Sequence, residues 1–112
     1  MANQTRKTYN KLVRDRIPEI IAAERRAYAT EIMEDAEYRQ ALLAKLVEEA
    51  QEAAEAEPSE LVKELADLYE VIDALLLAFD LGRDAIHAVQ QKRRDERGGF
   101  EQRIKLVWTE IG

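Results

Sequence analysis

Residues 46–67 read LVEEAQEAAEAEPSELVKELAD, two acidic segments of helical pattern separated by a proline. Pro58 ends the first segment as a helix, because its ring clashes with the preceding turn and its nitrogen carries no donor hydrogen. The chain is expected to reverse there. In such a hairpin the two helices run in opposite directions, so residues at equal height share a constant sum of residue numbers. The sequence therefore predicts an antiparallel helical hairpin.

Each helix of this hairpin carries two acids spaced three residues apart, so both side chains of a pair lie on one face. At equal heights, Glu49 faces Asp67 and Glu52 faces Glu64. The two levels are about 4.5 Å apart, given a rise of about 1.5 Å per residue. Four carboxylates in so small a volume raise one another's pKa values and take up protons. A divalent metal bound among them would resolve that conflict.

The competing interpretation is a pair of solvated helix faces, since 36% of the chain is charged. Glu49, however, belongs to an otherwise apolar series on the first helix, which directs its side chain toward the second helix. Glu64 and Asp67 border the apolar stripe of the second helix. The first series is Leu42, Leu46, Glu49 and Ala53, and the stripe is Leu61, Leu65, Leu68, Ile72, Leu75 and Phe79. These positions favour the metal site.

The ligand types indicate which metal fits. Carboxylate oxygens without thiols suit Mg²⁺ or Mn²⁺, and Mg²⁺ commonly shares phosphate oxygens of a substrate. The chain has no cysteine and one histidine, His87, so a Cys/His zinc site is excluded. His87 is interpreted as a packing or surface residue of a helix. We expect Mg²⁺, with Mn²⁺ as a possible substitute.

The acids resemble the motif of the MazG-like all-α nucleoside triphosphate pyrophosphohydrolases, in which two adjacent acids, a spacer and a third acid precede Glu-x-x-Asp on the next helix. The matching residues are Glu48, Glu49, Glu52, Glu64 and Asp67. Residues 9–18 (YNKLVRDRIP) and 97–100 (RGGF) look like segments that flank this motif in short relatives. The resemblance implies an Mg²⁺-dependent hydrolase that cleaves a nucleotide between its α- and β-phosphates, releasing a monophosphate and pyrophosphate. It also suggests a role in clearing unwanted nucleotides.

By this resemblance, Glu49, Glu52, Glu64 and Asp67 are the metal ligands, and Glu48 and Glu49 are the catalytic candidates. Glu48 lies about 100° around the helix from Glu49. Its role is open between a further ligand, a group that orients a ligand, a water-activating base, and a solvated or structural residue.

Two other functions remain as alternatives. Phosphoribosyl-ATP pyrophosphohydrolase of histidine biosynthesis has a comparable acidic pattern, but there a Tyr-His pair is expected soon after Glu-x-x-Asp. Here Asp67 is followed by Leu-Tyr-Glu-Val at 68–71. The other alternative is a non-catalytic helical dimerisation or metal-binding module.

A triphosphate also requires cations from the protein, and two basic clusters offer them. The candidates for binding phosphate or nucleotide are Lys11, Arg14, Lys92, Arg93 and Arg97. Arg97 precedes Gly98-Gly99, where the backbone can approach a phosphate closely. The alternative for this second cluster is helix termination, because basic residues in a last turn followed by glycine complement the helix dipole and cap the helix. Phe100 and Trp108 are either base-stacking or core residues.

Four helices are expected, over residues 17–28, 35–57, 59–81 and 84–96, with Asp35 as an N-cap and Gly82 as a helix-ending glycine. Residues 103–109 alternate polar and apolar side chains, which predicts a short strand near the C-terminus. The predicted fold is all-α, a four-helix chain with the hairpin as its core.

The 112 residues are expected to form a single MazG-like domain over 1–112. The helix near residues 74–79 is apolar almost all round, so we expect a homodimer or homotetramer that joins hairpins into a bundle. The net charge of −6 argues against nucleic-acid binding. No signal peptide or membrane-spanning stretch is visible, so no membrane association and a cytoplasmic location are expected.

Overall fold

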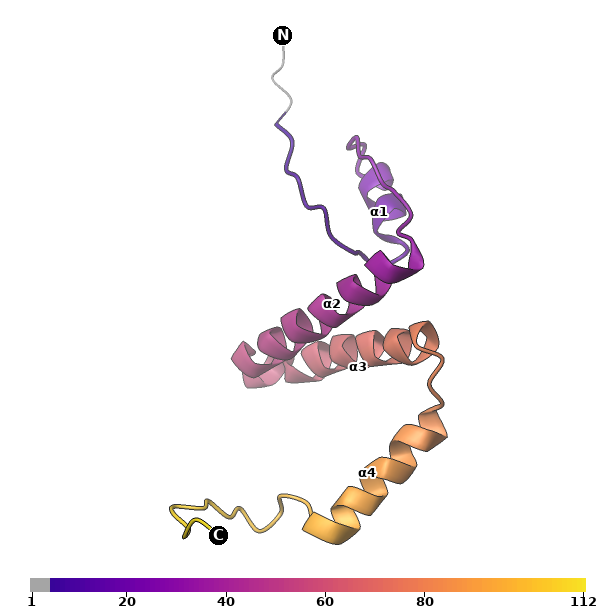
Figure 1. Cartoon of the computed structure of the whole chain (residues 1–112). Helices are drawn as coiled ribbons and strands as arrows, with labels where there is room; N and C mark the ends of the chain where they lie inside the picture. Colours follow the sequence, from indigo (N-terminus) through magenta and orange to yellow (C-terminus); the bar gives the residue numbers. More distant parts are fainter. Residues whose placement is uncertain (1–4) are drawn as a thin grey trace. The chain divides into compact units, whose positions relative to one another are not determined.

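The structure of this chain is a computed structural model, which describes residues 5–112. These residues form four α-helices and one short 3₁₀-helix and contain no strand, so the all-α prediction is confirmed (Figure 1). They divide into two compact units, one ending at Asp80 and the other running from Leu81 to Gly112. No helix in the described part combines the length and apolar character needed to cross a membrane.

The first unit begins with a non-helical segment and a short helix, α1 (Ile17–Ala23), with Pro18 in its first turn. The predicted helix over 17–28 is therefore too long at its C-terminal end. The reason is a change of backbone conformation at Arg25, whose φ of 59° is left-handed and cannot continue a right-handed helix. The N–H of Arg25 instead donates to the carbonyl of Ala22 at 2.9 Å, closing the last turn.

The next two helices are α2 (Asp35–Glu55) and α3 (Leu61–Ala78), and the 3₁₀-helix η1 (Pro58–Glu60) connects them. The predicted break at Pro58 is confirmed. The N-cap of α2 is Glu34, so the prediction of Asp35 as N-cap is wrong by one residue. Asp35 lies in the first turn of α2, where its negative charge still favours the positive end of the helix dipole.

α3 ends three residues earlier than the predicted range of 59–81, and Gly82 does not end it. The left-handed residue after α3 is Asp80, with φ 52°, a conformation that aspartate tolerates better than most residues. Gly82 has φ −79° and is the N-cap of α4 (Arg83–Arg97). The glycine therefore starts the next helix.

α2 and α3 pack against each other and form the core of the first unit (Figure 1). Leu42 of α2 is only 3% exposed, and among residues 5–112 it is the one residue that is fully buried. The other members of its predicted series, Leu46, Glu49 and Ala53, are half-buried. At the far end, Arg39 Nε donates to the carbonyl oxygen of Ala78 at 3.0 Å. In the predicted stripe of α3, Leu68, Ile72 and Leu75 are half-buried, whereas the other three members are 39–40% exposed.

The second unit consists of α4 and the residues that follow it. α4 agrees with its predicted range of 84–96 to within one residue at each end, and Gly98 with φ 82° follows it. The predicted strand over 103–109 is wrong, because these residues have no regular secondary structure. A strand requires backbone hydrogen bonds to a neighbouring strand, and residues 5–112 contain none to pair with.

Candidate functional site: three converging carboxylates

Three acids from the two packed helices converge at one place. Glu49 of α2 and Glu64 and Asp67 of α3 each contribute a carboxylate oxygen, and these oxygens all lie within 4.8 Å of one another. All three residues are half-buried. We call Glu49, Glu64 and Asp67 the acidic triad. Its oxygens are close enough for one cation to contact all three.

Two oxygens of the acidic triad lack a partner. Oε2 of Glu49 and Oε2 of Glu64 are shielded from solvent, and neither accepts a hydrogen bond. A buried polar atom without a partner costs about 1–3 kcal/mol, and more if it is charged. These two atoms are therefore placed where a proton or a metal ion would lower the free energy of the folded protein.

The pKa of Glu49 also indicates that the acids of this site are crowded. Burial raises the pKa of Glu49 above its usual value, and the carboxylates of Glu52 and Asp67 raise it further, while Lys45 opposes them. The predicted fourth ligand, Glu52, thus lies close enough to act on Glu49, but it is exposed and is not one of the three converging residues. The structure brings together three of the four predicted ligands.

Glu48 faces a different environment from its neighbour Glu49. Lys11 Nζ donates to Glu48 Oε1 at 3.0 Å, and Lys45 Nζ lies 3.8 Å from the same oxygen. The hydrogen bond from Lys11 holds the pKa of Glu48 below its usual value and the pKa of Lys11 above its own. Glu48 is consequently an ionised, paired carboxylate at the edge of the acidic triad.

Arg14 contacts the acidic triad directly. Its Nη2 donates to Asp67 Oδ1 at 2.7 Å, the distance of a strong charge-assisted hydrogen bond. Lys11 and Arg14 were predicted as phosphate-binding residues, and in this structure both are bound to carboxylates of the site. The sequence pattern did not indicate these two contacts, nor the one from Lys45. The contact between Lys45 and Glu48 could have been predicted, because the two residues are three apart on one helix.

The remaining predicted cations belong to the second unit. Lys92 pairs with Glu96 within α4 at 3.9 Å, and both side chains are largely exposed. Arg93 is exposed, and Arg97 lies in the last turn of α4, where its charge complements the helix dipole. His87 is an exposed residue of the same helix.

The turn after α4 is stabilised by an ion pair that sequence reasoning missed. Arg94 Nη2 lies 2.5 Å from Glu101 Oε1, and this hydrogen bond lowers the pKa of Glu101. A Cβ atom at Gly99 would lie 2.4 Å from both Arg94 Nη1 and Glu101 Oε2. Glycine therefore lets the two charged side chains close over the backbone. The pair's spacing of seven residues, across a glycine-containing turn, gives no simple sequence signal.

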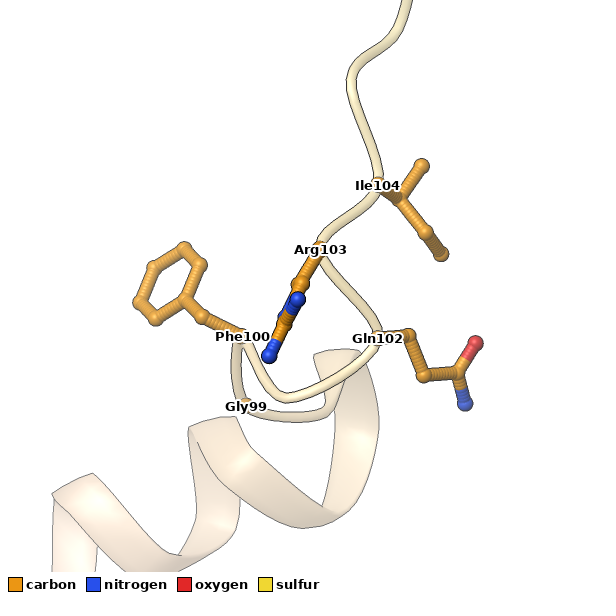
Figure 2. A pocket seen from close by; sticks show the side chains of 5 residues that line it. All are labelled: Gly99, Phe100, Gln102, Arg103 and Ile104. Atoms are coloured by element: carbon orange, nitrogen blue, oxygen red, sulfur yellow. The ribbon is translucent and has the colours of Figure 1, made fainter.

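Beyond this ion pair the turn surrounds an open hollow of about 200 Å³. Its lining residues are Gly99, Phe100, Gln102, Arg103 and Ile104 (Figure 2). Phe100 is 97% exposed, so it is not a core residue of this chain on its own, and neither is Trp108, at 76%. The hollow lies in the second unit and carries no carboxylate of the acidic triad.

The donor set of the acidic triad fits Mg²⁺ or Mn²⁺. It consists of carboxylate oxygens alone, two of which lack a hydrogen-bond partner. Comparisons of the chain with protein-family models, with curated proteins and with solved structures found no match.

Proposed function

We propose that this chain is a MazG-like, Mg²⁺-dependent nucleoside triphosphate pyrophosphohydrolase, which converts a nucleoside triphosphate to a monophosphate and pyrophosphate. The observation that carries the proposal is the convergence of Glu49, Glu64 and Asp67, with two buried oxygens that lack partners. In this proposal α2 and α3 form the antiparallel hairpin that presents the acids, and the enzyme acts in the cytoplasm on the nucleotide pool.

Each acid has a role that follows from its surroundings. Glu49, Glu64 and Asp67 would hold the metal, and Glu52, which is exposed and close enough to raise the pKa of Glu49, would join them. When bound, Mg²⁺ neutralises charge on the phosphates and lowers the pKa of a bound water. In the metal-free protein the pKa of Glu49 is raised, whereas the hydrogen bond from Lys11 lowers the pKa of Glu48. Both glutamates stay catalytic candidates.

The phosphates of the substrate require positive charge as well. Lys11 and Arg14 already lie beside the acids, within 3.0 Å of Glu48 and 2.7 Å of Asp67 respectively. A triphosphate bound to a metal in the acidic triad would come within reach of both side chains. The phosphate-binding role of Lys92, Arg93 and Arg97 stays a prediction from the sequence.

The active protein is proposed to be a homodimer or homotetramer that joins hairpins into a bundle. Several large apolar side chains of α2 and α3 are exposed to solvent. In the core of a protein such side chains are normally buried. Those more than 60% exposed are Val47, Val62, Tyr69 and Leu77. Burying each such side chain is worth about 1.5–3 kcal/mol, so a second hairpin supplies stability that one hairpin lacks.

The proposal is tested by measuring pyrophosphate and monophosphate release from a panel of canonical and modified ribo- and deoxyribonucleoside triphosphates, with phosphoribosyl-ATP included. Each substrate is assayed with Mg²⁺, with Mn²⁺ and with a chelator. We expect release that the chelator abolishes. Glu64→Gln is expected to lose at least 100-fold in turnover, about 2.7 kcal/mol in activation free energy. The matched control Glu70→Gln, an exposed acid on the same helix, should keep wild-type turnover.

Other results separate the alternatives. Turnover of phosphoribosyl-ATP alone would move the protein to histidine biosynthesis. Absence of turnover across the panel, in folded protein that binds Mn²⁺, would identify a non-catalytic metal-binding module. Loss of folding without loss of specific activity in Glu64→Gln would assign the acid to structure and contradict a catalytic metal site.

A further inference from the structure

The segment before α1, residues 5–16, carries cations that cross to the acidic site. This segment is non-helical, and two of its side chains bridge long distances in sequence. Lys11 reaches Glu48 of α2, 37 residues away, and Arg14 reaches Asp67 of α3, 53 residues away. We call residues 5–16 the N-terminal strap. Lys11 and Arg14 of the strap therefore contact both helices that build the proposed metal site.

Arg14 contacts the same residue that a metal would use. Asp67 belongs to the acidic triad, and its Oδ1 accepts the hydrogen bond from Arg14 at 2.7 Å. A guanidinium is a monocation and neutralises one carboxylate. It leaves the buried Oε2 atoms of Glu49 and Glu64 without partners. The guanidinium thus balances part of the charge of the acidic triad, and the rest remains available to a divalent ion.

We propose that Arg14, supported by Lys11, is an exchangeable counter-ion: it occupies Asp67 in the free protein and transfers to substrate phosphate when a divalent metal binds the acidic triad. This inference rests on the proposed function. A metal at Asp67 repels the guanidinium and competes for the same oxygens. The phosphates that arrive with the metal offer Arg14 a new anion in the same place, with fork geometry suited to its guanidinium.

The local structure permits this exchange at little cost. The side chains of the Arg14–Asp67 pair are 58% and 32% exposed, so water replaces either partner readily. The backbone of Arg14 is meanwhile fixed, because its carbonyl accepts a hydrogen bond of 3.0 Å from the N–H of Ile17 at the start of α1. Leu12 within the strap and Ile17 directly after it are half-buried. The side chain can therefore change partners while the strap stays in place.

Exchange has a signature that a structural ion pair lacks. Removing Arg14 frees Asp67 for the metal, so affinity for metal alone rises. The same change removes a phosphate contact, so affinity for a triphosphate falls. A residue that merely supports the fold would lower both affinities when it is replaced.

The test measures two affinities by calorimetry on the full chain. The first is for Mn²⁺ alone, and the second is for inorganic tripolyphosphate in excess Mg²⁺, which presents the phosphates without a base. We expect Arg14→Gln to bind Mn²⁺ about two- to fivefold more tightly than wild type, the range for a partly exposed ion pair. Its affinity for magnesium tripolyphosphate should fall by at least a comparable factor. Arg16→Gln is the matched control, because Arg16 pairs with Glu19 at 3.0 Å, away from the acidic triad, and should leave both affinities unchanged.

Unchanged or weaker Mn²⁺ binding by Arg14→Gln would overturn the exchange. Asp67→Asn separates this failure from failure of the proposed metal site. If Asp67→Asn loses Mn²⁺ binding while Arg14→Gln equals wild type, the metal site stands and the exchange is wrong. If wild type binds no Mn²⁺, or Asp67→Asn binds it as well as wild type, the metal site itself is wrong and the exchange falls with it.

Discussion

At the scale of single residues, two adjacent glutamates on α2 have opposite electrostatic states. Glu49 is half-buried among other acids and has a raised pKa, while Glu48 is paired with Lys11 and has a lowered pKa. Adjacent helical residues point about 100° apart, which places one side chain toward α3 and the other toward the N-terminal strap. The difference follows from the helix geometry and gives the two residues different roles.

The raised pKa of Glu49 predicts how the stability of the metal-free protein depends on pH. The folded state holds this proton more tightly than the unfolded state, so the contribution of Glu49 is complete below the ordinary value of 4.5 and is lost as pH rises through the raised pKa. Glu48 affects stability at lower pH. Its contribution to the free energy of unfolding is present above pH 4.5 and is lost as the pH falls through its lowered pKa. Urea unfolding in chelator across this pH range measures both effects.

Glu49→Gln should remove the decline above pH 4.5 and raise the free energy of unfolding in chelator by about 0.5–1 kcal/mol at neutral pH, as repelling charges become fewer. Added Mn²⁺ should stabilise wild type and leave this variant unchanged. The control Glu48→Gln should keep the decline. A Glu49→Gln variant that is less stable than wild type in chelator would contradict the crowded-acid account.

At the scale of secondary-structure elements, the long periodic helices were predictable and the short elements were not. α2, α3 and α4 carry regular apolar spacing over several turns, and Pro58 marks the turn between the first two. The end of α1 depends on the left-handed conformation of Arg25, which no residue pattern specified. The alternation at 103–109 indicated a strand, but a strand depends on a partner elsewhere in the chain. Local pattern predicts local hydrogen bonds better than distant ones.

The candidate site shows the same division. Equal heights across the Pro58 turn predicted that Glu49 faces Asp67 and Glu52 faces Glu64. In the structure Glu49, Glu64 and Asp67 converge, and Glu52 is not one of the converging residues. The contacts of Lys11 and Arg14 with these helices depend on the path of a non-helical segment, which sequence spacing does not determine. Both residues were expected at phosphates, and their carboxylate partners became visible only in three dimensions.

The packing of α2 on α3 predicts which single truncation harms the hairpin most. Among residues 5–112, Leu42 is the one side chain nearly shielded from solvent, at 3% exposure, and Leu42→Ala should cost about 2–3 kcal/mol. This value lies low in the usual range, because the half-buried neighbours can relax into the space. Leu81→Ala, at a residue 50% exposed and outside both helices, should cost less. Urea unfolding followed by circular dichroism compares the two, and equal losses would contradict the assignment of Leu42 as the centre of the core.

At the scale of the whole molecule, the chain has many apolar side chains and few that are buried. Acidic residues outnumber basic ones by 23 to 17, which keeps the surface negative and disfavours a nucleic-acid partner. A negative surface does not oppose a mononucleotide held through a metal. We propose that the open apolar faces of α2 and α3 serve assembly and that the acidic triad is a metal-dependent site.

Assembly is tested at one exposed position of α3. Val62 is 81% exposed, and Val62→Glu should dissociate the oligomer by placing a charge in its proposed interface. Its neighbour Lys63 has a side chain 71% exposed, and Lys63→Gln is the matched control, because it changes the net charge by the same single unit as Val62→Glu. Sedimentation equilibrium should show a dimer or tetramer for wild type and Lys63→Gln, and a monomer for Val62→Glu. A monomeric wild type would contradict the bundle.

The most direct measurement of the central claim is pyrophosphate release from nucleoside triphosphate by wild type and by Glu64→Gln, each in Mg²⁺ and in chelator. We expect release by wild type in Mg²⁺ and almost none in the other three conditions. Equal release by wild type and Glu64→Gln, or release that persists in chelator, would show that the converging carboxylates do not form a catalytic metal site.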